Sequence, residues 1–272
     1  MEQHHSPSVD SASRILKLLT RYRTPRASLT QICTELKLPK SSCSRILKTL
    51  ESHGLLRYDS PTHLYSLGPY AIVLGARAEE NTDYFADLKP VMREAAERTN
   101  MTVAWVQQVD ARRMMYVAKH EGAAIYRVSI SIGNRFPITD VSYGQWVLAF
   151  ASQTERQRLL AGGLRAMTPV TITDVDQYCD HIEQIRHEGV LISRGEYVPG
   201  VCAISCPVFN SRGELLGELA ALGLMPTMME SDYSRAVEVM VEISKRSYFY
   251  PDNATPPERA PDEEVLVSIA SR

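Results

Sequence analysis

Residues 28–50, SLTQICTELKLPKSSCSRILKTL, decide the fold of the first part of the chain. Apolar residues recur there at positions i, i+3, i+4 and i+7, which is the buried stripe of an amphipathic helix. The two stripes are Leu29/Ile32/Cys33/Leu36 and Cys43/Ile46/Leu47/Leu50. Ser28 with Gln31 is a capping box that opens the first helix, and Pro39 suits the first turn of the second. The short gap between them predicts a helix-turn-helix pair.

The flanking residues extend this pair into a larger domain. Upstream, Ile15/Leu18/Leu19/Tyr22 have the same spacing and predict a preceding helix. Downstream, residues 55–58 and 64–67 read as short strands around the turn-forming residues 59–63. Three helices and a hairpin predict a winged helix-turn-helix over residues 9–68.

The second helix of the pair carries a polar stripe on the side away from its apolar one. Ser41, Ser44, Arg45 and Lys48 again have the spacing i, i+3, i+4, i+7. Serine permits close approach to a major groove, arginine can fork onto a guanine edge, and lysine holds phosphate. We expect the flanking Lys40 and Ser42 to contact the DNA backbone.

Charge is distributed unevenly in a way that agrees with this interpretation. Residues 9–78 contain 11 Lys and Arg against 4 Asp and Glu, a net charge of +7. Because the whole chain has a formal charge of −2, the remainder sums to −9. A basic quarter joined to an acidic remainder is expected when only one part of a protein faces a polyanion.

The rest of the sequence predicts an α+β domain over residues 83–250, joined by a linker helix within 69–82. Its first helix, 83–99, contains Pro90, which predicts a kink or a later start. Alternating residues predict strands at 102–109, 113–119, 125–132, 190–193, 201–210 and 214–224. Helical patterns cover 141–151, 154–160, 174–187 and 231–248. Residues 1–8 and the proline-rich, acidic residues 251–272 are predicted to be disordered.

Several classes of function are disfavoured by what the sequence lacks. No apolar run is long enough to span a bilayer and no secretory signal is visible, so a cytoplasmic protein without membrane contact is expected. The 5 cysteines are scattered without a C-x-x-C pair, and no histidines have metal-ligand spacing, so no metal site is predicted. Nucleophile-elbow, dinucleotide-binding, P-loop and H-E-x-x-H motifs are absent, and we expect neither enzyme activity nor a cofactor.

Motifs in both halves resemble those of the IclR family of transcriptional regulators, over residues 9–250. The first half has Ser28-Leu29-Thr30, Leu38-Pro39-Lys40-Ser41-Ser42, Arg45-Ile46-Leu47, Leu50-Glu51, Gly54 and Tyr65-Ser66-Leu67-Gly68 in the family's order. The second half has Gly189, Ser193, Glu196, Gly200, Ala203-Ile204-Ser205 and Val208-Phe209-Asn210. A spaced pattern of this length is much more specific than a helix-turn-helix match.

The resemblance implies a regulator that binds double-stranded DNA and itself. It implies that the first domain dimerises on a pseudo-palindromic operator, that dimers can pair into tetramers, and that a GAF-like second domain binds a small organic acid. The predicted DNA-binding residues are Ser28, Thr30, Lys40, Ser41, Ser42, Ser44, Arg45, Lys48 and His63. The effector-binding residues that it implies are Ile125, Val128, Phe136, Ser142, Tyr143, Ser193, Val201, Ala203, Glu218, Ala220 and Leu222.

This chain departs from the family pattern at the implied pocket floor. Ser193, Ala203, Ala220 and Leu222 stand where members that bind small keto acids present polar groups, which favours a larger, aromatic ligand. Strand alternation puts Glu218 on the same side as Ala220 and Leu222. Two alternatives stay open for Glu218. It faces the pocket and accepts a hydrogen bond from a ligand, or it lies in water or pairs with Arg127 or Arg135.

The sequence therefore predicts a transcriptional regulator whose DNA binding or activating ability responds to a small, aromatic organic acid. One alternative is a small-metabolite enzyme that uses the first domain only to dimerise. Another keeps the DNA binding and makes the sensor vestigial.

Overall fold

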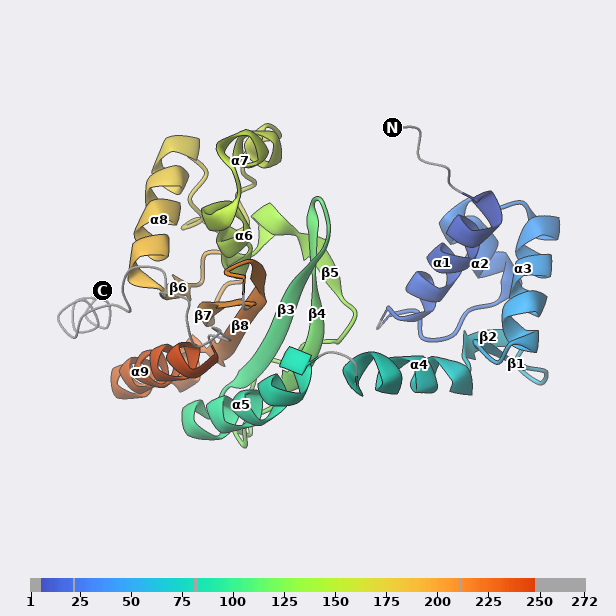
Figure 1. Ribbon diagram of the computed structural model, residues 1–272, viewed down its shortest axis with the longest axis horizontal. Coiled ribbons are helices and arrows are strands. Elements are labelled where there is room, and N and C mark those ends of the chain that lie inside the picture. The colour runs from blue at the N-terminus through green and yellow to red at the C-terminus, as the bar shows by residue number, and fades with distance from the viewer. Residues whose placement is uncertain (1–5, 22, 81–82, 211, 248–272) are drawn as a thin grey trace. The chain divides into compact units, whose positions relative to one another are not determined.

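The computed structural model describes residues 6–21, 23–80, 83–210 and 212–247 of the 272-residue chain (Figure 1). The chain divides into two compact units, Met1–Ala86 and Asp87–Arg272. Within the described residues, no helix combines the length and the apolar character that crossing a membrane requires.

The first unit is a winged helix-turn-helix followed by one more helix. Its elements are α1 (Pro7–Leu19), α2 (Leu29–Leu36), α3 (Lys40–Ser52), β1 (Leu56–Asp59), β2 (Leu64–Leu67) and α4 (Pro69–Glu80). The predicted capping box opens α2: Gln31 N donates to Ser28 Oγ at 3.3 Å, and Ser28 N donates to Gln31 Oε1 at 2.8 Å. Lys37 ends α2 in the left-handed conformation, at φ +53, and Pro39 is the N-cap of α3. The turn between the two helices is therefore short and defined.

The predicted apolar stripes form the core of this unit. Ile15 and Leu18 of α1, Ile32 of α2, and Cys43 and Leu47 of α3 are all at most 1% exposed. The hairpin is tied to the loop before α2, because Ala27 and Tyr65 exchange two backbone hydrogen bonds of 3.0 and 2.8 Å. Packing of the three helices against the wing therefore fixes which face of α3 stays outside.

The second unit is an α+β domain. Its helices are α5 (Asp83–Thr99), whose start precedes the unit boundary, α6 (Gln145–Phe150), α7 (Gln153–Leu160), α8 (Val175–Glu188) and α9 (Glu230–Ser247). Its strands are β3 (Thr102–Asp110), β4 (Arg113–His120), β5 (Arg135–Pro137), β6 (Leu191–Arg194), β7 (Val201–Phe209) and β8 (Leu215–Leu224). Three 3-10 turns complete it, η1 (Ile138–Asp140), η2 (Ser142–Gly144) and η3 (Met225–Thr227). Pro90 lies inside α5, which runs past it.

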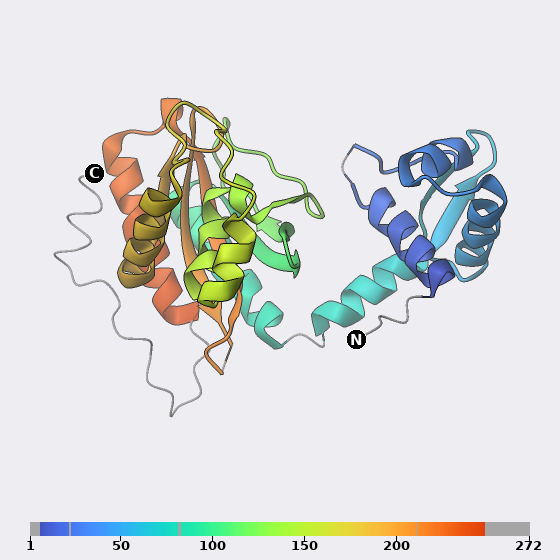
Figure 2. The ribbon, with the colours of Figure 1, turned by 90° about the horizontal axis from the view of Figure 1, so that it is seen from above.

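The strands form one antiparallel sheet of 6 strands in the order β5-β4-β3-β8-β7-β6. Figures 1 and 2 show α6, α7 and α8 on one side of this sheet and α5 and α9 on the other. On the second side Cys206 Sγ reaches Met240 O of α9 at 3.5 Å, and Arg98 of α5 bonds Glu242 of α9 at 2.5 Å. We call the side covered by α6 the inner face.

The inner face is defined by register and alternation. Val106 of β3 lies opposite both Tyr116 of β4 and Glu218 of β8, and Ala220 lies opposite Ser205 of β7. Because side chains alternate along a strand, every second residue joins this face. Its members are Thr102, Ala104, Val106, Gln108, Met114, Tyr116, Lys119, Phe136, Leu191, Ser193, Val201, Ala203, Ser205, Pro207, Glu218, Ala220, Leu222 and Leu224.

Two predicted elements are wrong. Residues 125–132 are not a strand; the chain runs as a loop there, and its carbonyls are bonded by side chains instead of a neighbouring strand. Residues 141–151 are not one helix, because η2 precedes a six-residue α6 that ends at Phe150. In both places the spacing of apolar residues reflects contact with the core and not a regular strand or helix.

The predicted disordered ends are only partly described. Pro7 and Ser8 belong to α1, which corrects the expectation of disorder over residues 1–8 there. Residues 1–5 and the predicted tail, 251–272, lie outside the described residues.

Candidate DNA-binding and effector sites

The polar stripe of α3 is exposed as predicted. Ser41, Arg45 and Lys48 are exposed and Ser44 is half-buried, whereas Cys43 and Leu47 on the opposite side are fully buried. Lys40, at the start of the helix, is exposed and Ser42 is half-buried. A rigid core on one side and free cationic and hydroxyl groups on the other are what a helix needs to enter a major groove.

The other predicted DNA-binding residues lie at the start of α2 and at the tip of the wing. Thr30 is exposed in the first turn of α2, but the hydroxyl of Ser28 is committed to the capping box. His63 lies at the tip of the wing in the left-handed conformation, φ +57, and its Nδ1 is 2.7 Å from Tyr58 Oη. That contact orients the histidine ring at the wing tip.

Two exposed cations were missed by the sequence analysis. Lys37 lies in the turn between α2 and α3, and Arg57 lies on β1 of the wing. The helix-turn-helix pattern itself contained the signal for Lys37, because the turn residues flank the start of the exposed helix.

In the second unit, α6 is anchored on a floor of small side chains. Trp146 Nε1 of α6 donates to Ser205 Oγ of β7 at 2.9 Å, and both residues are buried. Ala104, Ala203 and Ala220 of the same face are at most 5% exposed. Because alanine side chains are short, these three neighbouring strands leave room above the sheet for larger groups from other elements.

Three aromatic rings pack together in the same cluster as these alanines. The ring centroid of Tyr116 is 4.8 Å from that of Phe136 and 6.1 Å from that of Tyr143, and Phe136 and Tyr143 are 5.6 Å apart. The hydroxyls of Tyr116 and Tyr143 share a buried hydrogen bond. Burial raises the pKa of both phenols, so both are neutral at physiological pH.

Glu218 is the one carboxyl on the inner face. Its side chain is 0% exposed, and neither Oε1 nor Oε2 has a hydrogen-bond partner among the described residues. Burial raises the pKa of Glu218 well above its ordinary value of 4.5. The alternative of an exposed or arginine-paired Glu218 is therefore wrong. Arg127 instead bonds Glu121 and Ala124 O at 2.8–3.3 Å.

The structure brings most of the predicted effector residues together. Tyr143, Ala203, Ala220 and Leu222 belong to one apolar cluster, against which Val128 and Phe136 pack. Ser142 and Ser193 are buried, Ser142 in η2 and Ser193 on the inner face, and Val201 is half-buried at the start of β7. Ile125 is 88% exposed on the loop between β4 and β5. The implied position of Ile125 on an apolar wall of the pocket is therefore wrong.

Tyr116 and Ser205 belong to the same surface and were missed. Alternation along residues 113–119 groups Met114 with Tyr116, but only the pairing of β4 with β3 and β8 shows which side they face.

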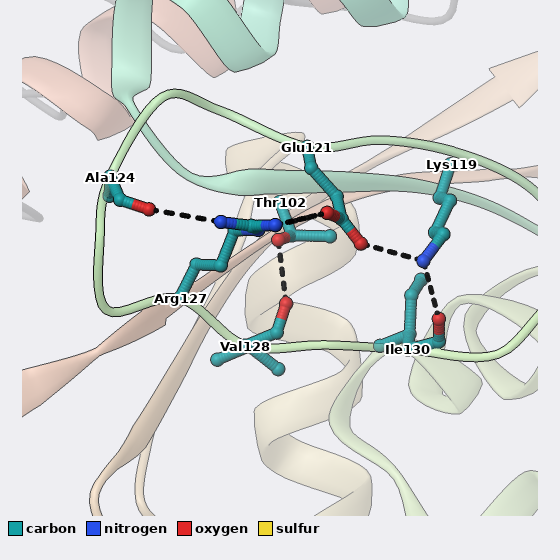
Figure 3. A network of polar contacts seen from close by, with 7 residues as sticks. All are labelled: Thr102, Lys119, Glu121, Ala124, Arg127, Val128 and Ile130. Atoms are coloured by element: carbon teal, nitrogen blue, oxygen red, sulfur yellow. Dashed lines mark hydrogen bonds and ion pairs between the residues drawn. The ribbon is translucent and has the colours of Figure 1, made fainter.

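The loop between β4 and β5 is pinned across the edge of the inner face (Figure 3). Thr102 Oγ1 donates to Val128 O at 2.6 Å, and Lys119 Nζ donates to Ile130 O at 2.9 Å. Glu121 joins Lys119 at 2.6 Å and Arg127 at 2.8 Å. Hydrogen bonds from Lys119 and then Arg127 lower the pKa of Glu121. These contacts hold Val128 inward and leave the loop's tip outside.

A cavity of about 410 Å³ lies at the end of the sheet, beside this loop. Leu222 is the predicted effector residue in its lining, which is otherwise built from residues near 97–101, 124–127 and 223–235. No cluster of three His, Cys, Asp or Glu suited to a metal ion occurs within the described parts of the chain.

The winged helix-turn-helix and the exposed cationic side of α3 define the class of DNA-binding proteins, here with a separate α+β domain. Comparison with known families agrees with this class. Residues 8–60 match the "IclR helix-turn-helix domain" and residues 76–245 match the "Bacterial transcriptional regulator IclR C-terminal" domain. The chain belongs to the IclR family of bacterial transcriptional regulators, so the enzyme alternative is wrong.

Relatives match along most of their length. The chain is 25% identical over 243 residues to the HTH-type transcriptional regulator BhcR of Paracoccus denitrificans, covering 89% of this chain and 86% of the relative. It is 33% identical to the crystal structure of an IclR regulator from Alicyclobacillus acidocaldarius, with a TM-score of 0.84 and coverage of 90% and 98%.

A second solved structure has the same fold at lower identity. An IclR homologue from Microbacterium hydrocarbonoxydans, crystallised with 4-hydroxybenzoate, has a TM-score of 0.75 at 18% identity, covering 88% of this chain and 96% of that one.

Proposed function

We propose that this protein is a regulator whose operator affinity or activating ability changes when a small aromatic acid binds on the inner face of its second domain. The observation that carries the proposal is Glu218, a fully buried carboxyl without a partner among the described residues, beside a floor of alanines. Burying such a group without a hydrogen-bond partner costs free energy. A ligand that bonds the carboxyl would offset that cost. Crystallisation of a protein of this fold with 4-hydroxybenzoate supports a ligand of one ring.

The proposed DNA contacts follow from the chemistry of the exposed side of α3. Arg45 forks onto a base edge, Ser41 and Ser44 allow close approach, and Lys40, Ser42 and Lys48 bind phosphates. Thr30 and His63 contact the backbone beside α3, whereas Ser28 acts by fixing the start of α2. Two copies reading a pseudo-palindrome would place their α3 helices about 34 Å apart.

For Arg45→Ala we expect weaker and less selective operator binding. Loss of a bidentate base contact costs about 1–3 kcal/mol, or roughly 5- to 150-fold in Kd, and relaxes the preference at one base pair of each half-site. Lys48→Ala is the matched control, because loss of a phosphate contact weakens binding to all sequences alike. Fluorescence anisotropy at fixed salt measures both. An Arg45→Ala protein with unchanged sequence preference would remove Arg45 from the base-reading role.

Self-association is proposed to use α4. Its apolar side chains Tyr70, Ile72, Val73 and Leu74 are 47–76% exposed, and none of its described residues is buried. Several large apolar side chains left exposed on one helix are typical of an interface. A dimer through α4 would join two DNA-reading units, and coupling to the ligand would run through residues 69–99. A differential free energy of about 1–3 kcal/mol between two dimer geometries is sufficient for such coupling.

Ile72→Glu should therefore weaken self-association by roughly 2 kcal/mol, about thirtyfold, because it places a charge in the apolar contact. Sedimentation equilibrium measures the change, and operator binding should weaken with it. Val9→Glu is the control, since Val9 is a similarly exposed apolar residue of α1, at 63%. Equal behaviour of the two variants would contradict a dimer built on α4.

Ligand binding is tested by thermal shift of the full chain with aromatic and aliphatic acids. A ligand that binds only the native state must raise the melting temperature by mass action. Operator binding is then measured with and without each stabilising compound. Operator binding without any compound that stabilises the second domain would favour a vestigial sensor.

A further inference from the structure

We propose that the ligand of the inner face presents a hydrogen-bond donor, an aromatic hydroxyl or amino group, to the carboxyl of Glu218. This deepens the proposed function and rests on it, because it names the chemistry of the compound that the same site takes. A plain aromatic acid without such a donor is then a poor ligand.

The first argument is that buried hydrogen-bond acceptors lack partners among the described residues. Glu218 Oε1 and Oε2 are buried and no described residue bonds them, and the oxygen that carries no proton is an acceptor in either protonation state. Gln145, at the start of the helix that covers the same face, has a third such acceptor, Oε1, while its Nε2 is 3.1 Å from Tyr197 Oη. A complementary ligand must therefore bring donors.

The second argument is that no free cation occurs on this surface. Among the described members of the inner face, Glu218 is the only carboxyl and Lys119, opposite Ala104, is the only Lys or Arg. Lys119 is committed to Glu121 and Ile130 O, and the nearby Arg127 and Arg165 are committed to Glu121 and Asp140. A ligand carboxylate placed on Glu218 would meet no free cation there, so we expect the ligand's own carboxylate to point away from it.

The third argument is position. Glu218 lies in the middle of β8, between Val106 of β3 and Pro207 of β7, so its carboxyl is held in the sheet and not at its end. Tyr143 and Tyr116 belong to the same apolar cluster, and their hydroxyls bond each other and not the carboxyl. A ligand ring that displaces the Tyr143 ring therefore brings its own donor to the carboxyl that the tyrosines leave unsatisfied.

Direct titration calorimetry on the full chain tests the donor. The probes are benzoate and its hydroxy-, amino- and fluoro-derivatives, each substituted at the ortho, meta or para position. Fluorine is close to hydroxyl in size and cannot donate, so each hydroxy/fluoro pair isolates the donor. For at least one ring position we expect the hydroxy or amino compound to bind ten- to hundredfold more tightly than its fluoro partner, the range of a hydrogen bond to a charged or buried group.

The variants assign that preference to Glu218. Glu218→Leu should bind the hydroxy and fluoro compounds equally, and Glu218→Gln, which keeps one acceptor oxygen, should retain part of the preference. Glu238→Gln, at an exposed position of α9, should behave as the wild type. Near-ultraviolet circular dichroism checks that each variant is folded.

Three results would overturn the inference: equal binding of hydroxy and fluoro compounds by the wild type, a preference that survives in Glu218→Leu, or binding of none of the probes by a protein that binds its promoter fragment. The promoter measurement on the same preparation separates this failure from that of the proposed function, since loss of DNA binding would count against the latter alone.

Discussion

Replacing Glu218 with leucine should make the ligand-free protein more stable. The carboxyl is fully buried without a partner among the described residues, and leucine has a similar volume without a polar group to desolvate. Burying an unsatisfied polar group costs about 1–3 kcal/mol by the measure of mutational data. The second domain should therefore melt roughly 2–12 °C higher, at about 2–4 °C per kcal/mol for a domain of this size. Differential scanning calorimetry without ligand measures it.

The gain should also depend on pH with a definite sign. Burial raises the pKa of Glu218 in the folded state, so the native protein keeps a proton that the unfolded chain has lost above pH 4.5. Stability contributed by this group is thus fully present below that pH and falls as the pH rises toward the folded-state pKa, by at most about 1.4 kcal/mol per pH unit. The difference between Glu218→Leu and the wild type should grow from pH 5 to pH 7.

Glu238→Gln provides the comparison for this experiment. Its exposed side chain should leave stability within about 0.5 kcal/mol of the wild type at every pH. The opposite result would be a destabilised Glu218→Leu variant whose difference from the wild type does not vary with pH. It would mean that a partner stabilises the carboxyl, which contradicts a buried carboxyl without a hydrogen bond. A stability gain would show that Glu218 is retained for something other than folding, as functional sites often require.

Gly144→Ala should have the opposite effect, a loss of about 2–4 kcal/mol in the second domain. A Cβ at Gly144 would overlap the carbonyl oxygen of Ile138, and would lie 2.8 Å from its carbonyl carbon. Because both of these atoms belong to the backbone, η1 or η2 must move, and α6 with Trp146 moves with them. Overpacking against backbone in a filled core is destabilising by this order.

Gly162→Ala is the matched control for this substitution. An added Cβ at Gly162 meets nothing within 4 Å, and its φ is not in the left-handed region. Thermal unfolding of the two variants, with titration of any ligand found for the wild type, separates a general glycine effect from the close approach of η1 and η2. Equal melting temperatures would mean that this part of the backbone yields easily.

Much of the first domain could be predicted from local patterns. The stripes of α1, α2 and α3, the capping box at Ser28 and the two wing strands all involve residues within a few positions of one another. Helix periodicity also separates the buried Cys43 from the exposed Arg45, because both lie on the same helix. Family resemblance added the pairing of this domain with a sensing domain.

The second domain was harder to predict in two places. The alternation of residues 125–132 suggested a strand, yet Thr102 and Lys119 bond the carbonyls of this segment through their side chains. Such contacts join residues more than ten positions apart and leave no periodic trace. For the same reason, Tyr116 could not be placed opposite Val106 and Glu218 before the register of three strands was known.

The sequence by itself determined the helix-turn-helix, the cationic side of α3 and the side of β8 to which Glu218 belongs. These follow from periods of 3.6 and 2 residues, which any chain of this pattern must express locally. Only the tertiary structure decided that Glu218 is fully buried and without a partner among the described residues, and that Ile125 lies outside. Burial and hydrogen-bond partners depend on which distant strands and helices pack together, and the packing of β3, β7, β8 and α6 is a property of the whole domain.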